Sequence, residues 1–497
     1  IVRATKSSPL TKEQMKSKRI CFQIAILALV TIGLIHIPSA ELRRTINLNW
    51  YLKKKLTGRR LQSTSDGVLS YNQDDIVALS WGLNGGHSIL LAFDGTNFKA
   101  FLFGHNNMSW RYVSTISLII HALESNYPDR FRPDQPVFQM VFTVSDFLDP
   151  TCALPHRVCP ESEFYAPFVS FSSLYRNKKV FPTAKAFPNT IFTECILSWL
   201  RDSTSCNWKK VDQNIKLEEL ETKLIWRGSD FYFLPGLFDQ YRNNHQMQNV
   251  FSKDSLTALS DIDVLEKMMK HYLQMTPRWK AVVLSLKERL SNDANNSHPW
   301  IDALFTGPTN KATHDLLNDR GIIVSDSNSI DAIMMSKYKY QLDLGGGGGT
   351  TWEGTLTKLL MPGVLFHHET PTKDWFYDFM EPYVHYIPVD LELKNLRSQY
   401  EWAEENPEKV KMIAENSTKF AENLLSADYL AQLYKELFVD YFGELIEAYQ
   451  PQDRSWTECL QLYNKMGLKL RQIAHCDDES CSVEWNDGII NQISKRF

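Results

Sequence analysis

Five consecutive glycines, Gly345–Gly349, stand directly after a strand-like apolar run, Tyr338–Leu344. The segment that follows them, from Glu353, can begin a helix. Glycines let the backbone adopt positive φ angles and let a ligand approach closely, and N–H groups at a helix start favour anions such as a diphosphate. The loop is either a phosphate-binding loop, to which Thr350 and Thr351 add hydroxyl donors, or a flexible connection. Its place directly after a strand favours phosphate binding.

Strand-like and helical patterns alternate through the second half of the chain. Strand-like runs include Leu224–Ser229, Ala281–Leu286 and Gly363–His367. Apolar residues have helical spacing over Asp261–Gln274, and Asn406-Pro407 offers a cap and a first turn for another helix. This alternation predicts an α/β fold with a mostly parallel sheet.

The composition is that of a globular protein. The chain has 497 residues, of which 43% are apolar and 23% charged, so disordered, collagen-like and coiled-coil proteins are excluded. Its length predicts two to three domains. The net charge of −4 and the pI of about 6.4 exclude a general nucleic-acid binder, so we expect no nucleic-acid partner.

One segment near the start has the composition of a membrane helix. Residues 20–37 carry no formal charge, follow a basic segment and end at Pro38. A signal anchor would leave the bulk of the chain in the lumen, whereas a signal peptide cleaved near Ala40 would release it. The apolar run is longer than a usual signal core, which favours the anchor. We therefore expect a single-pass type II protein of the Golgi or endoplasmic reticulum membrane, with a cytosolic tail (residues 1–19), an anchor (20–38) and a stem (39–70).

The cysteines occur as spaced pairs. Of eight cysteines, Cys21 lies in the apolar segment, and the other seven include Cys152/Cys159 and Cys195/Cys206, each closing a short loop. In a lumenal chain these pairs indicate disulfides; the alternative is buried, reduced thiols. Seven is an odd number, so at least one thiol stays free or pairs with another chain. The sequence also contains three glycosylation sequons, at Asn107, Asn295 and Asn416.

Two charged residues stand where strands are expected to end. Arg227, beside Gly228, can reach a phosphate with a bidentate fork, although a surface salt bridge is the alternative. Asp146 follows the strand-like run Val137–Val144. A carboxylate at the carboxyl edge of a strand can face a cleft and act as a general base; its alternative role is to cap the loop.

Other motifs are absent or ambiguous. No GxSxG, HExxH or paired CxxC motif is present, and the glycine run is followed by no Gly-Lys-Ser/Thr of a P-loop. His367 and His368 are adjacent, which favours core or surface histidines over metal ligands. Asp261 and Asp263 have the DxD spacing of a metal–diphosphate site, but they stand at a helix start, where acidic residues are expected. We therefore expect no metal site.

An ordered series of segments resembles glycosyltransferase family 90, which includes protein O-glucosyltransferases and fungal capsule-associated xylosyltransferase-like proteins. The series covers roughly residues 135–425 and includes Val141–Phe147, Ile225–Ser229, Pro277-Arg278 with Val282–Ser285, Trp300–Thr306, Ser336–Gly345, Gly363–His367 and Tyr383–Asp390. Each segment is only modestly specific, but the ordered series is strong.

The resemblance implies a GT-B architecture, in which two Rossmann-like domains flank the active site. Residues 71–215 would form the acceptor-side domain and 216–450 the donor-binding domain, with 451–497 as a cysteine-containing tail. The implied reaction moves a sugar, with glucose or xylose expected, from a UDP-sugar to a hydroxyl of a protein or polysaccharide. It proceeds with inversion and uses no metal or other cofactor.

The resemblance also assigns roles to residues. Asp146 corresponds to the general base, and Arg227 and Ser229 to contacts with the diphosphate. The glycine loop corresponds to a donor-binding loop. The expected donor-binding residues are Arg227, Gly228, Ser229, Gly347, Gly348, Gly349, Thr350, Thr351, Trp352 and Lys358.

The glycine loop departs from the family pattern. Family members usually carry an arginine just after the aromatic residue, where it meets the diphosphate, whereas here Trp352 is followed by Glu353. The segment up to Gly363 is also about two residues longer. Either Lys358 replaces the lost charge, or Glu353 points away from the phosphates. The alternative function is a catalytically inactive, transferase-like binding or scaffold protein in the lumen.

Overall fold

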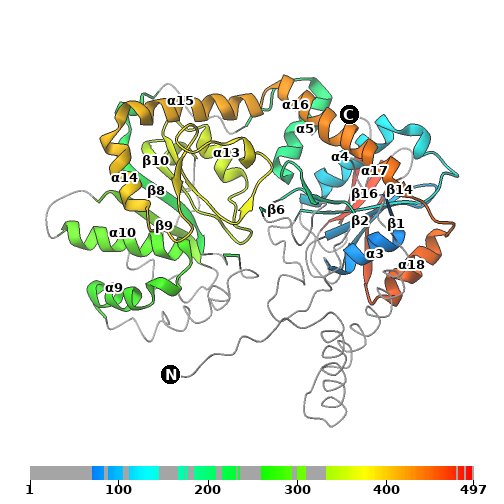
Figure 1. Cartoon of the computed structure of the whole chain (residues 1–497), viewed down its shortest axis with the longest axis horizontal. Coiled ribbons are helices and arrows are strands. Elements are labelled where there is room, and N and C mark those ends of the chain that lie inside the picture. The colour runs from blue at the N-terminus through cyan, green and yellow to red at the C-terminus, as the bar shows by residue number, and fades with distance from the viewer. Residues whose placement is uncertain are drawn as a thin grey trace, which may run out of the picture. The chain divides into compact units, whose positions relative to one another are not determined.

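The computed structural model describes residues 70–82, 88–103, 111–144, 166–172, 174–176, 184–208, 215–230, 233–234, 259–293, 299–308, 332–476, 480–485 and 489–494 (Figure 1). The chain divides into two compact units, and nearly all of these residues belong to the unit of residues 64–464 and 468–497. No helix within the described ranges is long and apolar enough to cross a membrane. The predicted tail, anchor and most of the stem lie outside these ranges.

A five-stranded parallel sheet forms the core of the second half of the chain (Figure 1). Its order is β13 (Ile387–Val389), β11 (Val364–His368), β10 (Tyr338–Asp343), β8 (Glu221–Asp230) and β9 (Ile301–Pro308). Its apolar side chains are buried on both faces, as expected for parallel strands. The predicted α/β class, the parallel sheet and the strands corresponding to β8, β10 and β11 are confirmed.

Helices cover this sheet. They are α10 (Pro277–Asp293), α13 (Glu353–Leu359), α14 (Leu396–Glu405) and α15 (Pro407–Leu424), and α9 (Asp261–Lys270) packs against α10. Helix α10 packs against β9, and α13 and α15 pack against β11.

The strand prediction for Ala281–Leu286 is wrong, because this run lies inside α10. Ala281, Val282, Val283 and Leu286 are buried there against the core. A short, continuous apolar run does not distinguish a buried helix segment from a buried strand by its periodicity. Pro407 occupies the first turn of α15 as predicted, but the Asn406 side chain does not cap that helix and donates instead to the Trp402 carbonyl at 2.8 Å.

A second, mixed sheet of eight strands is built mainly from the first half of the chain. Its order is β17 (Ile489–Ser494), β16 (Ser480–Trp485), β15 (Leu470–Cys476), β3 (Phe98–Phe103), β2 (Ser88–Phe93), β4 (Phe138–Thr143), β5 (Phe168–Ser170) and β7 (Ala184–Ala186). Only the β4–β5 and β5–β7 pairs are parallel. The segment predicted as a tail therefore contributes three strands to this sheet, together with helix α18 (Trp456–Lys465).

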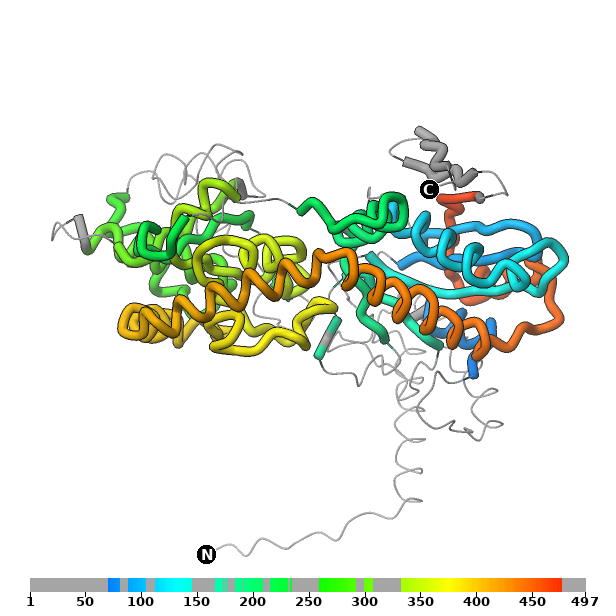
Figure 2. The backbone as a smooth tube through the Cα atoms, turned by 90° about the horizontal axis from the view of Figure 1, so that it is seen from above, coloured from blue at the N-terminus to red at the C-terminus, as the bar shows by residue number. Residues whose placement is uncertain are grey.

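The remaining helices and short strands connect with these two sheets. The helices are α3 (Gln73–Gly82), α4 (Arg111–Asn126), α5 (Thr190–Asp202), α16 (Ala427–Tyr434) and α17 (Tyr441–Ala448), with a π-helical segment at Lys435–Asp440. Figure 2 shows the chain passing from α15 directly into α16 and α17. Strand β1 (Tyr71–Asn72) pairs with β14 (Tyr449–Gln450), and β6 (Leu174–Tyr175) pairs with β12 (Thr372–Lys373).

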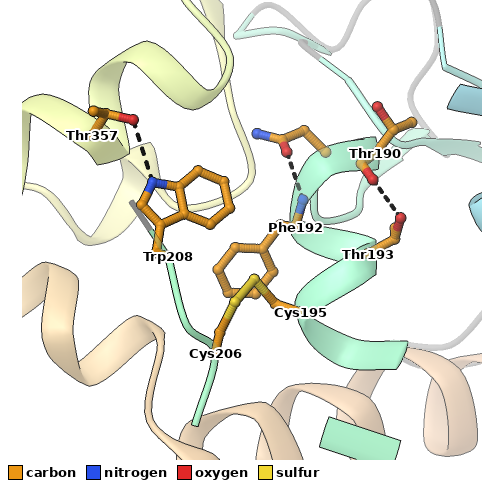
Figure 3. Close-up of a disulfide and its surroundings, with 8 residues drawn as sticks. Thr190, Phe192, Thr193, Cys195, Cys206, Trp208 and Thr357 are labelled. Atoms are coloured by element: carbon orange, nitrogen blue, oxygen red, sulfur yellow. Dashed lines mark hydrogen bonds between the residues drawn. A yellow bond between two sulfur atoms is a disulfide. The ribbon is translucent and has the colours of Figure 1, made fainter. Parts of the chain in front are cut away.

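A disulfide joins Cys195 of α5 to Cys206, so this predicted pair is confirmed (Figure 3). It holds the segment after α5 against that helix. Two residues further on, Trp208 donates from its indole nitrogen to Thr357 Oγ1 of α13 at 3.3 Å. Cys459 is a free, buried thiol, whereas Cys152 and Cys159 lie outside the described residues.

Candidate functional site

Three strand ends of the parallel sheet carry the residues of the candidate donor site. The chain passes through Arg227 and Ser229 near the end of β8, enters the glycine loop after β10, and reaches His367 and His368 at the end of β11. Because β8, β10 and β11 are parallel neighbours, their carboxyl ends lie at the same edge of the sheet. Ligands of open α/β sheets bind at this edge.

The glycine loop is buried and held by hydrogen bonds. Residues 345–350 are all buried. The Gly345 N–H donates to His368 Nδ1 at 3.2 Å, and the N–H groups of Gly346 and Gly349 donate to carbonyls within the loop at 3.0 and 2.9 Å. These contacts describe a closely packed loop rather than a flexible connection.

Close packing explains why glycines are needed here. A Cβ on Gly345 would lie 2.3 Å from the Gly349 carbonyl oxygen, and one on Gly349 would lie 2.2 Å from Thr372 Oγ1. Gly349 also has a φ of +82°, a conformation that L-residues rarely adopt. Any side chain at these two positions would therefore open the loop.

Several donors in the loop have no acceptor. Within the part of the chain that the structure describes, no hydrogen bond is made by the N–H groups of Gly347, Gly348 and Thr350. The Thr350 hydroxyl is buried and also lacks a partner. A buried, unsatisfied polar group costs about 1–3 kcal/mol. A cluster of such donors is therefore suited to an anionic ligand.

Arg278, in the first turn of α10, lies against the same loop. Its guanidinium donates to the Ser229 carbonyl at 2.9 Å and to the Leu344 carbonyl at 3.1 Å. A Cβ on Gly346 would lie 3.0 Å from Arg278 Nη2. Arg278 lies in one of the family-like segments, but no pattern in the sequence indicated a role for its side chain. The structure places its charge between Ser229 and the glycine loop.

Arg227 is engaged by a carboxylate on the neighbouring strand. Its Nη2 lies 2.8 Å from Asp302 Oδ2, and its Nη1 lies 3.1 Å from Asp302 Oδ1. The Arg227 side chain is only 7% exposed. A Cβ on Gly228 would lie 2.6 Å from the Trp226 ring, so glycine is required beside it. The role of Arg227 in binding a diphosphate stays a prediction.

Lys358 is also engaged, in a buried network around Asp343. Its Nζ lies 3.0 Å from Asp343 Oδ1, and the carboxylate also accepts from Thr351, Thr355 and His367. Burial alone would raise the pKa of Asp343, but the Lys358 ammonium and the hydrogen bonds from His367 and Thr355 hold it well below its usual range. The proposed contact of Lys358 with phosphate also stays a prediction.

Glu353 is the first residue of α13, after Trp352, whose φ is +57°. The charge of Glu353 acts on Glu194 of α5, since burial and this neighbouring carboxylate together raise the pKa of Glu194. Glu353 therefore adds negative charge between the glycine loop and α5.

The two adjacent histidines are core residues. His367 donates to Asp343, and His368 accepts from Gly345 and lies 3.0 Å from the Leu391 carbonyl through Nε2. Burial lowers the pKa of His368 to about 4, so it is neutral at pH 7. No group of three His, Cys, Asp or Glu residues that could hold a metal occurs within the described ranges. The DxD pair is a helix start, because Asp263 forms a capping box with Ser260.

Asp146, the predicted base, lies outside the described residues. The preceding strand is confirmed as β4, whose last residue, Thr143, is followed by the buried Val144. The role of Asp146 stays a prediction.

Comparison with known proteins identifies the class of the region that contains the glycine loop. Residues 306–469 match the model of glycosyl transferase family 90, so the resemblance found in the sequence is confirmed over this range. The matched range includes the glycine loop, Lys358 and the two histidines. Arg227, Arg278 and Asp146 lie before it.

Curated relatives that match part of the chain are named protein O-glucosyltransferases. The chain is 32% identical to protein O-glucosyltransferase 2 of Danio rerio over 111 residues, and 32% identical to protein O-glucosyltransferase 3 of Homo sapiens over 107 residues. These alignments cover 21% of this chain and only 21% and 20% of the two relatives. A solved structure of Anabaena HepE in complex with UDP-glucose aligns with 55% of this chain and 79% of its own, at 11% identity and a TM-score of 0.26. That score is too low to support an argument.

Proposed function

We propose that the protein is an inverting glycosyltransferase of GT-B architecture, which moves glucose or xylose from a UDP-sugar to a hydroxyl of a protein or polysaccharide. The match of residues 306–469 to the family 90 model supports the class of reaction. The names of the curated relatives favour glucose as the sugar and a protein as the acceptor. Xylose differs from glucose by one CH₂OH group, so selection between them depends on the shape of the pocket.

The observation that carries this proposal is the buried glycine loop with its unengaged donors. The N–H groups of Gly347, Gly348 and Thr350 and the Thr350 hydroxyl offer uncharged donors to a diphosphate. Arg278, held beside the loop, adds a guanidinium whose fork matches phosphate oxygens. Together they would stabilise the negative charge that develops on UDP as it leaves.

In the proposed reaction, the Asp146 carboxylate takes the proton of the acceptor hydroxyl. The hydroxyl oxygen then forms a bond to the anomeric carbon while the bond from that carbon to the UDP oxygen breaks. UDP departs with the electron pair from the opposite face, so the configuration inverts. A base that acts in this way must approach within about 2.6–3.2 Å of the hydroxyl in the reactive complex.

The test uses the full chain, purified in detergent. UDP affinity is measured by calorimetry, and release of UDP from a panel of UDP-sugars is measured with acceptor peptides and oligosaccharides. Acceptor-dependent release of UDP supports the transferase. UDP binding without release from any donor indicates the alternative, a transferase-like binding protein, and overturns the enzymatic proposal. Absence of UDP binding overturns the donor site itself.

A further inference from the structure

The residues that follow β11 hold the glycine loop from one side. The Thr370 hydroxyl donates to the Gly349 carbonyl at 2.8 Å, and the Thr372 hydroxyl donates to the Gly348 carbonyl at 2.7 Å. Both threonines are buried, with 6% and 3% exposure. We call Thr370 and Thr372 the threonine clamp.

The clamp determines which way the loop's N–H groups point. In a trans peptide, the carbonyl of one residue and the N–H of the next point in opposite directions. The bond from Thr370 to the Gly349 carbonyl therefore turns the Thr350 N–H away from the clamp. The Thr350 N–H is one of the buried donors that has no acceptor in the described part of the chain.

The neighbouring peptides are fixed in the same way. The bond from Thr372 to the Gly348 carbonyl orients the Gly349 N–H, which donates to the Gly346 carbonyl at 2.9 Å and closes the turn. The Leu234 N–H donates to the Gly347 carbonyl at 3.0 Å and so orients the Gly348 N–H. Three consecutive carbonyls are thus held, and their peptide N–H groups are oriented as a set.

We propose that Thr370 and Thr372 are positioning residues for the donor diphosphate. They do not contact the phosphates; Thr370 orients the Thr350 N–H towards them, and Thr372 keeps the turn of the loop closed. This role rests on the proposed function, because it requires a diphosphate at the glycine loop.

The backbone of the clamp is anchored in turn by the first half of the chain. The Arg176 N–H donates to the Pro371 carbonyl at 2.8 Å, and Arg176 Nε donates to the Thr370 carbonyl at 3.1 Å. Thr372 also pairs with Tyr175 in the short β6–β12 ladder. The strand that follows β5 therefore supports the donor loop through the clamp.

The test replaces each hydroxyl while keeping the side-chain shape. Thr370→Val and Thr372→Val each remove one hydrogen bond to the loop, so each should weaken UDP binding by about 3- to 10-fold. Thr370→Ser and Thr372→Ser keep the hydroxyl and should restore the affinity. The matched control is Thr193→Val in α5, which also removes a buried hydroxyl bonded to a carbonyl, that of Thr190, and should leave UDP affinity unchanged (Figure 3).

Hydrogen exchange of the full chain without ligand provides a second readout. Exchange over residues 345–352 should accelerate in the two valine variants of the clamp and stay at the wild-type rate in the serine variants and in Thr193→Val. Faster exchange with weaker UDP binding supports the proposal. If both valine variants fold and bind UDP with wild-type affinity, the positioning role of Thr370 and Thr372 is overturned, but the proposed function is not. Failure of the wild-type chain to bind UDP overturns the proposed function and this role with it.

Discussion

Lys358 Nζ lies 3.0 Å from Asp343 Oδ1, and this ion pair joins the last residue of β10 to the helix after the glycine loop. Asp343 has no exposed side-chain surface, and the Lys358 side chain is 10% exposed. The pair closes the two ends of the loop on each other, so the loop is fixed both at its ends and, through Thr370 and Thr372, along its length.

Removing Lys358 should destabilise the protein strongly. Lys358→Met leaves the buried Asp343 carboxylate without its cation, which typically costs about 3–5 kcal/mol. The free energy of unfolding in denaturant is the measurement. The double variant Asp343→Asn/Lys358→Met should recover part of the loss, because it leaves no unpaired charge. A Lys358→Met variant as stable as wild type would show that this ion pair does not stabilise the fold.

The same pair predicts a loss of stability in acid. The pKa of Asp343 is lowered in the folded protein, so the unfolded state binds more protons as the pH falls through its own pKa of about 3.9. The stabilisation is therefore complete above about pH 5 and declines below about pH 4.

A second buried carboxylate predicts the opposite pH dependence. Burial raises the pKa of Asp374 to about 6, although it accepts from the Trp375 N–H and from Asn189 Nδ2. The folded state then binds the extra proton, so this group's contribution to stability falls as the pH rises from about 4 to about 6. Asp374→Asn should remove about 1–3 kcal/mol of that decline.

Unfolding curves of the wild type and of Asp374→Asn at pH 4, 5, 6 and 7 measure how the stability of each changes with pH. Asp230 is a second source of the same effect, because burial raises its pKa to about 6 as well. Asp230→Asn is therefore the companion variant, and the double variant should show the flattest profile. A pH profile that neither substitution changes would contradict both assignments.

Local sequence patterns predict some strands of this fold, but they do not predict pairings between distant segments. The strands β8, β10 and β11 were predictable because apolar runs next to glycine or proline are local patterns. The helical structure of Ala281–Leu286 was not predictable, since a short apolar run fits a buried strand and a buried helix equally well. Strand β15 pairs with β3 across more than 360 residues, and no local pattern indicates such a partner.

In the candidate site, too, local patterns were predictable and contacts between distant residues were not. The position of the glycine loop was predictable from its composition and its place after a strand. The ion-pair partners of Arg227 and Lys358 were not predictable, because Asp302 is 75 residues from Arg227 and Asp343 is 15 residues from Lys358. Arg227 and Lys358 therefore form ion pairs in the folded protein that the sequence did not indicate. Arg278 lies at the loop although no local pattern in the sequence places it there.

Arg278 and Arg227 should behave differently when truncated. Arg278→Met removes the guanidinium between Ser229 and the glycine loop and should weaken UDP binding by about 10- to 100-fold, the equivalent of about 1.5–3 kcal/mol for a charged contact. Arg227→Met leaves Asp302 unpaired and should lower the free energy of unfolding. Calorimetry with UDP and denaturant unfolding separate the two effects. A large loss of UDP affinity in a stable Arg227→Met variant would indicate that Arg227 contacts the phosphates.

The membrane topology is open to a direct test. If residues 20–38 are a signal anchor and residues 1–19 are cytosolic, then protease added to sealed microsomes should remove only the N-terminal tail. An epitope at the C-terminus should stay protected until detergent is added. Digestion of the whole chain in sealed vesicles would contradict the predicted orientation, and a mature N-terminus near Ala40 would indicate a cleaved signal peptide instead.

Asp146, the proposed general base, follows β4 by three residues. Asn has nearly the same shape as Asp but does not accept the proton of the acceptor hydroxyl. Asp146→Asn should therefore lower turnover by about 10²- to 10⁴-fold, while UDP affinity and the unfolding midpoint stay near those of wild type. The matched control is Asp94→Asn, because Asp94 forms an ion pair with Lys99 in the β2–β3 turn and has no role in the proposed reaction. Near-normal transfer by the Asp146→Asn variant would show that the base is another residue, and that Asp146 caps its loop.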